Sequence, residues 1–192
     1  MGPAMAPSSP PDSDPLFHVL HEDDELLVVN KPAGLVCHPT KNGERSSLIG
    51  RARLHLGVPP AADFAPRPSD SVQPHLVNRL DRETGGVVLI AKTALVAGEL
   101  GRIMESRAVQ KEYVALVHGH VAAEQGTIDA PLGRDEHSRV AIKDCVRPDG
   151  APAQTDFFVE HRFVAAVGGA SVPASRLDSP SSFSLLRVCS SG

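Results

Sequence analysis

One carboxylate in residues 74–92 (PHLVNRLDRETGGVVLIAK) is placed where it could do chemistry. Asp81 lies between Arg79 and Arg82, on a connection between two segments that the sequence predicts to be extended. We expect an adjacent guanidinium to keep the Asp81 carboxylate ionised. The carboxylate would then be available as a nucleophile or as a general base.

The same segment also fits ordinary turn chemistry. Thr84, Gly85 and Gly86 follow Asp81, and glycine lets a backbone approach a ligand closely or adopt a positive φ. In the alternative interpretation, Asp81 or Thr84 bonds local backbone amides and the neighbouring charges are solvated. Residue types alone favour this alternative, because charged turns are common.

A resemblance to a known family changes that balance. Residues 78–86 (NRLDRETGG) resemble the HRLDxxTSG motif of the RluA-type pseudouridine synthases, with the Arg-Leu-Asp core and the Thr-x-Gly spacing intact. Asn78 stands where histidine is usual, and Gly85 where serine is usual. Residues 21–40 (HEDDELLVVNKPAGLVCHPT) resemble the opening of these enzymes, which have an acidic turn, a short strand and an N-K-P-x-G turn. Residues 111–117 match the family pattern K-x-Y-x-A-x-V completely.

The resemblance implies an isomerase that converts specific uridines in ribosomal or transfer RNA to pseudouridine. Asp81 matches the essential aspartate, which acts either as a nucleophile at the sugar or as a base that removes a sugar proton. Arg79 matches the arginine that helps hold the target nucleotide out of its stack. Tyr113 matches a tyrosine packed against the target base, although a half-buried strand position is the commoner fate of a tyrosine in a sheet. The residues expected to shape the loop are Thr84, Gly85 and Gly86.

Two other functions fit parts of the pattern. A glycosidase or nucleoside hydrolase could use Asp81 with Glu83, but two carboxylates on one face of a strand would not flank the scissile bond as glycosidases require. A catalytically inactive RNA-binding module could keep the synthase cleft without its chemistry. We prefer the synthase.

The sequence predicts no cofactor and no metal. Cys37, Cys145 and Cys189 are widely separated, with no C-x-x-C pair, and the nine histidines show no tight ligand spacing. No segment resembles a signal peptide, and no apolar run approaches 18 residues, so we expect a cytoplasmic protein without membrane contact. We also expect a monomer whose macromolecular partner is RNA.

The formal net charge of -4 is distributed unevenly. All charges before Lys31 are acidic, and without them residues 31–192 carry a net charge of about +2. A block between residues 31 and 53 contains five basic side chains and one acidic one, Glu44. It could contact phosphates or form a solvated surface, and the solvated surface is the more common outcome. The basic residues are Lys31, Lys41, Arg45, Arg51 and Arg53.

The chain's elements predict an α+β class, with a mixed, mostly antiparallel central sheet, flanking helices and a catalytic cleft. Residues 1–14 are rich in proline and serine and are expected to be disordered, whereas 15–192 would form the catalytic domain. Helices are expected from a Ser46 or Ser47 cap to about Leu56, and from a Thr93 cap to about Arg107. The strands are expected at residues 26–30, 87–91, 111–117, 127–133, 139–142, 155–163 and 183–189.

The resemblance covers residues 16–188, but relatives continue with a TGRxHQIR-like motif that this sequence lacks. We therefore expect the catalytic domain to be incomplete at its C-terminus and this chain to be a poor enzyme. The strand at 183–189 would then have an unpaired edge.

Overall fold

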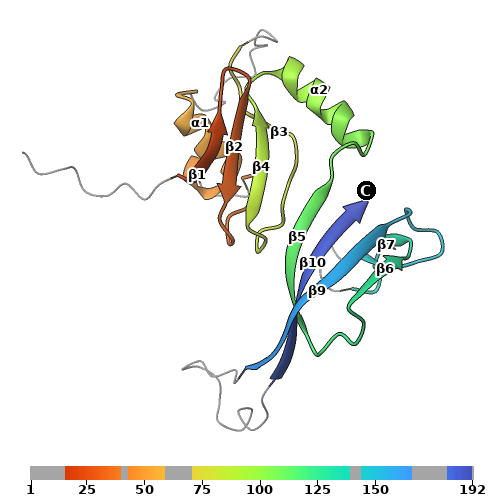
Figure 1. The fold of residues 1–192 in the computed structure, drawn as a ribbon. Coiled ribbons are helices and arrows are strands. Elements are labelled where there is room, and N and C mark those ends of the chain that lie inside the picture. Colours follow the sequence, from red (N-terminus) through yellow and green to blue (C-terminus); the bar gives the residue numbers. More distant parts are fainter. Residues whose placement is uncertain (1–15, 40–42, 59–70, 139–143, 166–180, 192) are drawn as a thin grey trace, which may run out of the picture. The chain divides into compact units, whose positions relative to one another are not determined.

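The structure is a computed structural model that describes residues 16–39, 43–58, 71–138, 144–165 and 181–191 (Figure 1). The chain divides into two compact units, residues 1–106 and 107–192. The segment expected to be disordered, 1–14, and the strand expected at 139–142 lie outside the described residues. No helix in the described ranges is long and apolar enough to cross a membrane.

The first unit is built on a four-stranded antiparallel sheet with the strand order β1-β2-β4-β3. The strands expected at 26–30 and 87–91 are confirmed as β2 and β4. The strand bounds are His18–Glu22 for β1, Leu26–Lys31 for β2, His75–Leu76 for β3 and Gly86–Ala91 for β4.

Side-chain alternation along β2 and β4 decides which face of this sheet is buried. Leu27 and Val29 of β2 lie opposite Ile90 and Val88 of β4, and all four side chains are fully buried. The continuous apolar run at 87–91 predicts a buried strand, and Val88, Ile90 and Ala91 are buried, but Val87 is 54% exposed. The continuous apolar run therefore predicts the strand correctly, but it does not predict which of its side chains are buried.

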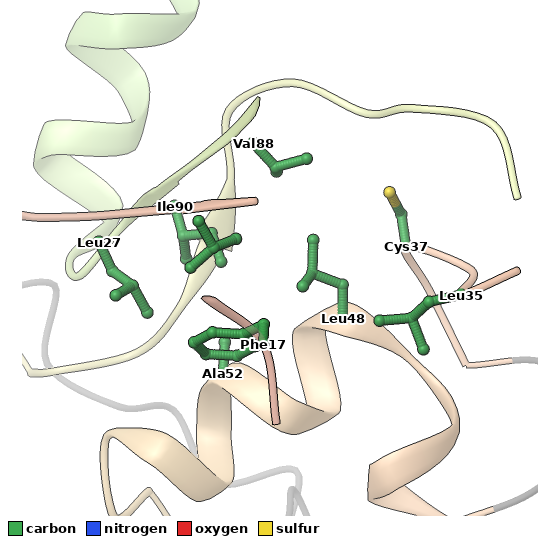
Figure 2. Packing of buried hydrophobic residues seen from close by; sticks show 9 residues of the cluster. Phe17, Leu27, Leu35, Cys37, Leu48, Ala52, Val88 and Ile90 are labelled. Atoms are coloured by element: carbon green, nitrogen blue, oxygen red, sulfur yellow. The ribbon is translucent and has the colours of Figure 1, made fainter. Parts of the chain in front are cut away.

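Helix α1 (Leu48–His55) covers the buried face of the sheet in the first unit. Its N-cap is Ser47, whose hydroxyl accepts a hydrogen bond from the backbone N–H of Gly50 and so satisfies a free donor of the first turn. Leu48 and Ala52 contribute to the core. Figure 2 shows these helix side chains and the strand side chains as parts of one cluster. The other members of the cluster are Phe17, Leu27, Val29, Leu35, Cys37, Val88 and Ile90.

Helix α2 (Ala94–Glu105) begins as expected at Thr93, whose hydroxyl accepts a hydrogen bond from the backbone N–H of Val96. Four apolar residues at helical spacing in this segment, Val96, Leu100, Ile103 and Met104, are expected from the sequence to be core. This expectation is wrong, since none of the residues of α2 is buried. Ile103 is 45% exposed and Leu95 is 67% exposed. The helix contacts β3 and β4 without being enclosed.

The second unit contains a four-stranded antiparallel sheet with the order β5-β10-β9-β6 and a two-stranded pair, β7-β8. The described residues thus confirm the α+β class with mostly antiparallel pairing. The strand expected at 127–133 is two strands, β6 and β7, in different sheets. The bounds are Lys111–His118 for β5, Gln125–Asp129 for β6, Leu132–Arg134 for β7, Asp144–Val146 for β8, Gln154–Ala165 for β9 and Ser181–Ser191 for β10.

The expectation of an unpaired edge at 183–189 is wrong, because β10 is a central strand. It pairs with β5 on one side, where Val188 lies opposite Tyr113, and with β9 on the other, where Val188 lies opposite Phe157. Figure 1 shows β10 between these two strands. Both of its backbone edges are therefore used in the sheet.

Ser184 of β10 is fully buried, and its hydroxyl connects two backbone groups of the turn after β5. It donates a hydrogen bond to the carbonyl of Gly119 (2.9 Å) and accepts one from the N–H of Val121 (3.0 Å). Ser184→Ala should lower the free energy of unfolding by about 1 to 3 kcal/mol, because both backbone groups lose their partner. Urea denaturation would measure this, with Ser190→Ala on the same strand as the control. Equal stability of the two variants would contradict the prediction.

Candidate active site

Asp81 lies on the connection between β3 and β4, and its side chain is exposed. The backbone N–H of Thr84 donates to the carbonyl of Asp81 (3.2 Å), which closes a tight turn immediately after the aspartate. The described residues offer the Asp81 carboxylate neither a hydrogen bond nor an ion pair. The local backbone therefore holds the aspartate while its oxygens stay accessible.

Asn78 anchors the loop on the side that precedes Asp81. Its side-chain amide donates to the carbonyl of Val87 (3.1 Å), and its side-chain oxygen accepts from the N–H of Leu89 (2.8 Å). Both partners are backbone groups of β4, so the asparagine continues the pairing of β3 with β4 beyond the end of β3. Asn78 thus has a structural role at a position where the family motif has histidine.

The two glycines form the side of the loop that follows Asp81. Gly86 has φ of 139°, a region that favours glycine. A Cβ atom on Gly85 would lie 3.3 Å from the carbonyl oxygen of Lys31 and 3.4 Å from the nitrogen of Ala33. The backbone of residues 31–33 therefore passes close to the loop at Gly85.

Residues 31–37 contact the Asp81 loop through four hydrogen bonds, one of which comes from Lys31. The N–H of Gly34 donates to the carbonyl of Arg82 (2.7 Å), and the Arg82 guanidinium donates back to the carbonyl of Gly34 (3.2 Å). The thiol of Cys37 donates to the carbonyl of Leu80 (3.3 Å). The carbonyls that directly precede and follow Asp81 in the chain are thus both hydrogen-bonded.

Lys31 lies at the centre of this support and is fully buried. Its ammonium donates to three backbone carbonyls: Leu35 (2.7 Å), Pro32 (3.0 Å) and Arg82 (3.2 Å). Burial lowers the pKa of the Lys31 ammonium, and the nearby acidic groups of Cys37, Glu83 and Asp81 act in the opposite direction. The cation next to the loop is therefore Lys31, a member of the basic block at residues 31–53, and its burial contradicts a place on a solvated surface.

A signal for this role of Lys31 was present in the sequence. Leu27, Val29 and Lys31 alternate along β2 and so share one face. The first two are core residues, which indicates that the third points inward as well. In register, Lys31 lies opposite Gly86, at the end of the Asp81 loop.

An adjacent guanidinium is expected to keep Asp81 ionised, but no arginine among the described residues forms an ion pair with its carboxylate. The Arg82 guanidinium contacts the carbonyl of Gly34 and lies 3.5 Å from the carboxylate of Glu83, both on the exposed side of the loop. The side chain of Arg79 is exposed. Both arginines therefore remain accessible to an anionic ligand.

Tyr113 belongs to β5 in the second unit and is 38% exposed. Its backbone pairs with Val188 of β10. Tyr113 is therefore accessible to solvent. The described parts of the chain contain no group of three or more histidine, cysteine, aspartate or glutamate side chains that could hold a metal ion.

Comparison with known proteins gives this loop its family context. The sequence model of the RNA pseudouridylate synthase family matches residues 25–188, which include the Asp81 loop and β5. The chain belongs to this family. The members include an uncharacterized RNA pseudouridine synthase of Bacillus subtilis, YlyB, which is 34% identical over 145 residues. Ribosomal large subunit pseudouridine synthase D of Xanthomonas campestris is 37% identical over 155 residues.

The matched region is a part of each relative. The alignment with the Bacillus subtilis synthase covers 76% of this chain and 45% of that protein, and the alignment with the Xanthomonas campestris synthase covers 81% and 43%. The matched region therefore makes up less than half the length of these relatives. Among solved structures, human RNA Pseudouridylate Synthase Domain Containing 1 has a TM-score of 0.63 at 22% identity, covering 94% of this chain and 62% of that one. At this identity the similarity supports the synthase fold.

Proposed function

We propose that this chain carries the catalytic region of an RNA pseudouridine synthase that isomerises specific uridines in ribosomal or transfer RNA. The observation that supports this most is the exposed carboxylate of Asp81, on a loop fixed at both flanking carbonyls, within a family-matched segment. Its substrate would be reached in the cytoplasm, and the enzyme would act as a monomer.

The proposed reaction needs one carboxylate and no redox step. The bond between N1 of uracil and C1′ of ribose breaks, the base rotates, and a bond from C5 to C1′ forms. C5 then loses its hydrogen as a proton and N1 gains a proton, so the product is an isomer of the substrate. Asp81 would act as the nucleophile at C1′ or as the base that removes a sugar proton.

The remaining site residues are assigned supporting roles. Arg79 would contact a phosphate and hold the target nucleotide out of its stack, which costs a few kcal/mol. Tyr113 would pack against the target base. Thr84, Gly85 and Gly86 would set the loop conformation, in keeping with the φ of Gly86 and the close backbone approach at Gly85.

The direct test uses ribosomal and transfer RNA transcripts labelled with tritium at C5 of uridine. Pseudouridine formation releases this tritium into water, so the wild-type chain should release it in proportion to the pseudouridine found by mapping. Release of free uracil would instead indicate a hydrolase. Binding of RNA without tritium release, unchanged in Asp81→Ala, would favour the inactive RNA-binding module.

Arg79→Ala should reduce turnover on a structured RNA more than on a short single-stranded RNA that contains the same uridine. Only the structured substrate must be unstacked, and loss of one charge-assisted contact corresponds to a decrease of about ten- to a hundredfold. The measurement is kcat/KM on both substrates, with Arg102→Ala, an exposed arginine of α2, as the control. Equal losses on both substrates would contradict a flipping role.

A further inference from the structure

A groove in the first unit has no role in the site described above. It has a volume of about 490 Å³, within the range of small-molecule sites. Part of its wall is apolar and comes from three separate segments: Pro39 after β2, Ile49 on α1 and Leu76 on β3. Such a wall offers a surface on which a planar ring can lie.

The polar part of the groove is basic. Arg53 of α1, His38 and His75 line it. The described residues provide no carboxylate paired with Arg53. Burial lowers the pKa of His75, and the positive charge of Arg53 lowers it further. The groove therefore combines one unpaired guanidinium with imidazoles that can donate or accept hydrogen bonds, a combination suited to a phosphate ester.

The other basic residues near α1 do not compete for this role. The Arg51 guanidinium donates to the carbonyls of Leu16 (2.8 Å) and Arg45 (2.8 Å), so it supports the fold. Lys31 is buried beneath the Asp81 loop. Of the basic block between residues 31 and 53, Arg53 is the described member that lines the groove, and Arg45 is exposed outside its lining.

The groove is connected to the Asp81 loop by short stretches of chain. His38 directly follows Cys37, whose thiol contacts the carbonyl of Leu80 at 3.3 Å. Leu76 precedes Asp81 by five residues, which limits their separation to about 18 Å even for a fully extended chain. The groove therefore lies within about 18 Å of Asp81, close enough for a nucleotide near the target uridine in the same RNA strand to reach it.

We infer that this groove binds one nucleotide of the substrate RNA that flanks the target uridine. Its phosphate lies against Arg53 and its base lies against Pro39, Ile49 and Leu76. This assignment rests on the proposed function for its biological context. It adds a specificity subsite, because a base held in a shaped pocket can be distinguished from other bases, whereas phosphate contacts alone carry no sequence information.

The test uses the full chain and uridine 5′-monophosphate as the probe, with uridine and inorganic phosphate as comparison ligands. NMR resonances of the His38 and His75 imidazoles report binding in the groove. We expect the monophosphate to shift both resonances saturably, with an affinity higher than that of either comparison ligand. Arg53→Gln should weaken its affinity about tenfold or more, because a charge-assisted contact is lost.

Two variants control for fold and charge. Arg45→Gln removes a positive charge outside the groove and should leave the affinity for the monophosphate unchanged. Arg53→Lys keeps the positive charge in the groove and should retain most of this affinity. Unshifted resonances, or equal affinity in wild type and Arg53→Gln, would overturn the assignment. Phosphate binding as tightly as the monophosphate would also overturn it, since the base would then contribute nothing.

The same titration separates this inference from the proposed function. Asp81→Asn should bind the monophosphate in the groove as the wild type does. A chain that forms no pseudouridine but shows groove binding lost in Arg53→Gln would contradict the catalytic proposal and support the groove as a nucleotide site. A chain that forms pseudouridine but shows no groove binding would contradict the groove alone.

Discussion

Asp81→Asn should abolish pseudouridine formation while leaving RNA binding close to that of the wild type. The amide has the shape of the carboxylate but can act neither as a nucleophile nor as a base. Even if Asp81 acts only as a general base, its loss corresponds to a decrease of about a hundredfold or more in turnover. The Asp81 side chain is exposed and makes no hydrogen bond or ion pair with the described residues. The variant should therefore have the same melting temperature as the wild type.

The matched control is Glu83→Gln, two residues further along the same loop. Glu83 is exposed and its contact with the Arg82 guanidinium is 3.5 Å long, so its charge contributes little to stability. Single-turnover tritium release from labelled RNA measures both variants. Activity of Asp81→Asn within about tenfold of wild type would exclude Asp81 as the catalytic group. Loss of activity in both variants would instead support a mechanism that uses the carboxylates of both Asp81 and Glu83.

The sequence was informative wherever structure depends on neighbouring residues. A hydroxyl before an apolar run can satisfy a free backbone donor of the first turn, which predicts Thr93 as one helix cap and Ser46 or Ser47 as the other; the structure has Ser47 in that place. The loop that carries Asp81 was found in the same way, from a short motif between two extended segments.

The sequence was less informative where structure depends on distant partners. The central place of β10 follows from pairing with β5, about seventy residues earlier in the chain, and no local pattern specifies that pairing. The exposure of α2 also depends on distant residues. A stripe of apolar residues predicts which face of a helix packs on a sheet, but not how much of that face the sheet covers. The alternation of β2 places Lys31 on the buried face, whereas its charge is typical of an exposed residue, so its role follows only from the carbonyls that the fold brings around it.

The second large effect is expected at Lys31, which holds three carbonyls together beneath the Asp81 loop. Lys31→Met keeps most of the side-chain volume but leaves the carbonyls of Pro32, Leu35 and Arg82 without this donor. The carbonyl of Arg82 keeps its bond from the N–H of Gly34, so two carbonyls lose the donor outright and one loses it in part. We expect the free energy of unfolding to fall by about 3 kcal/mol or more, a large share of the stability of a small domain.

Lys92→Met is the comparison that isolates this effect. Lys92 is also poorly exposed, at 12% of its side chain, but its ammonium makes an ion pair with Glu22 (2.9 Å) whose carboxylate is in contact with solvent. Its replacement should cost about 1 kcal/mol or less.

Urea denaturation gives both values, and hydrogen exchange at the N–H groups of Gly34 and Thr84 reports on the loop itself. Exchange at both positions should accelerate in Lys31→Met and stay at the wild-type rate in Lys92→Met, because Lys31, unlike Lys92, donates to the carbonyl of Arg82 next to Asp81. Equal stability of the two variants, with unchanged exchange in the loop, would show that the buried lysine does not position the aspartate.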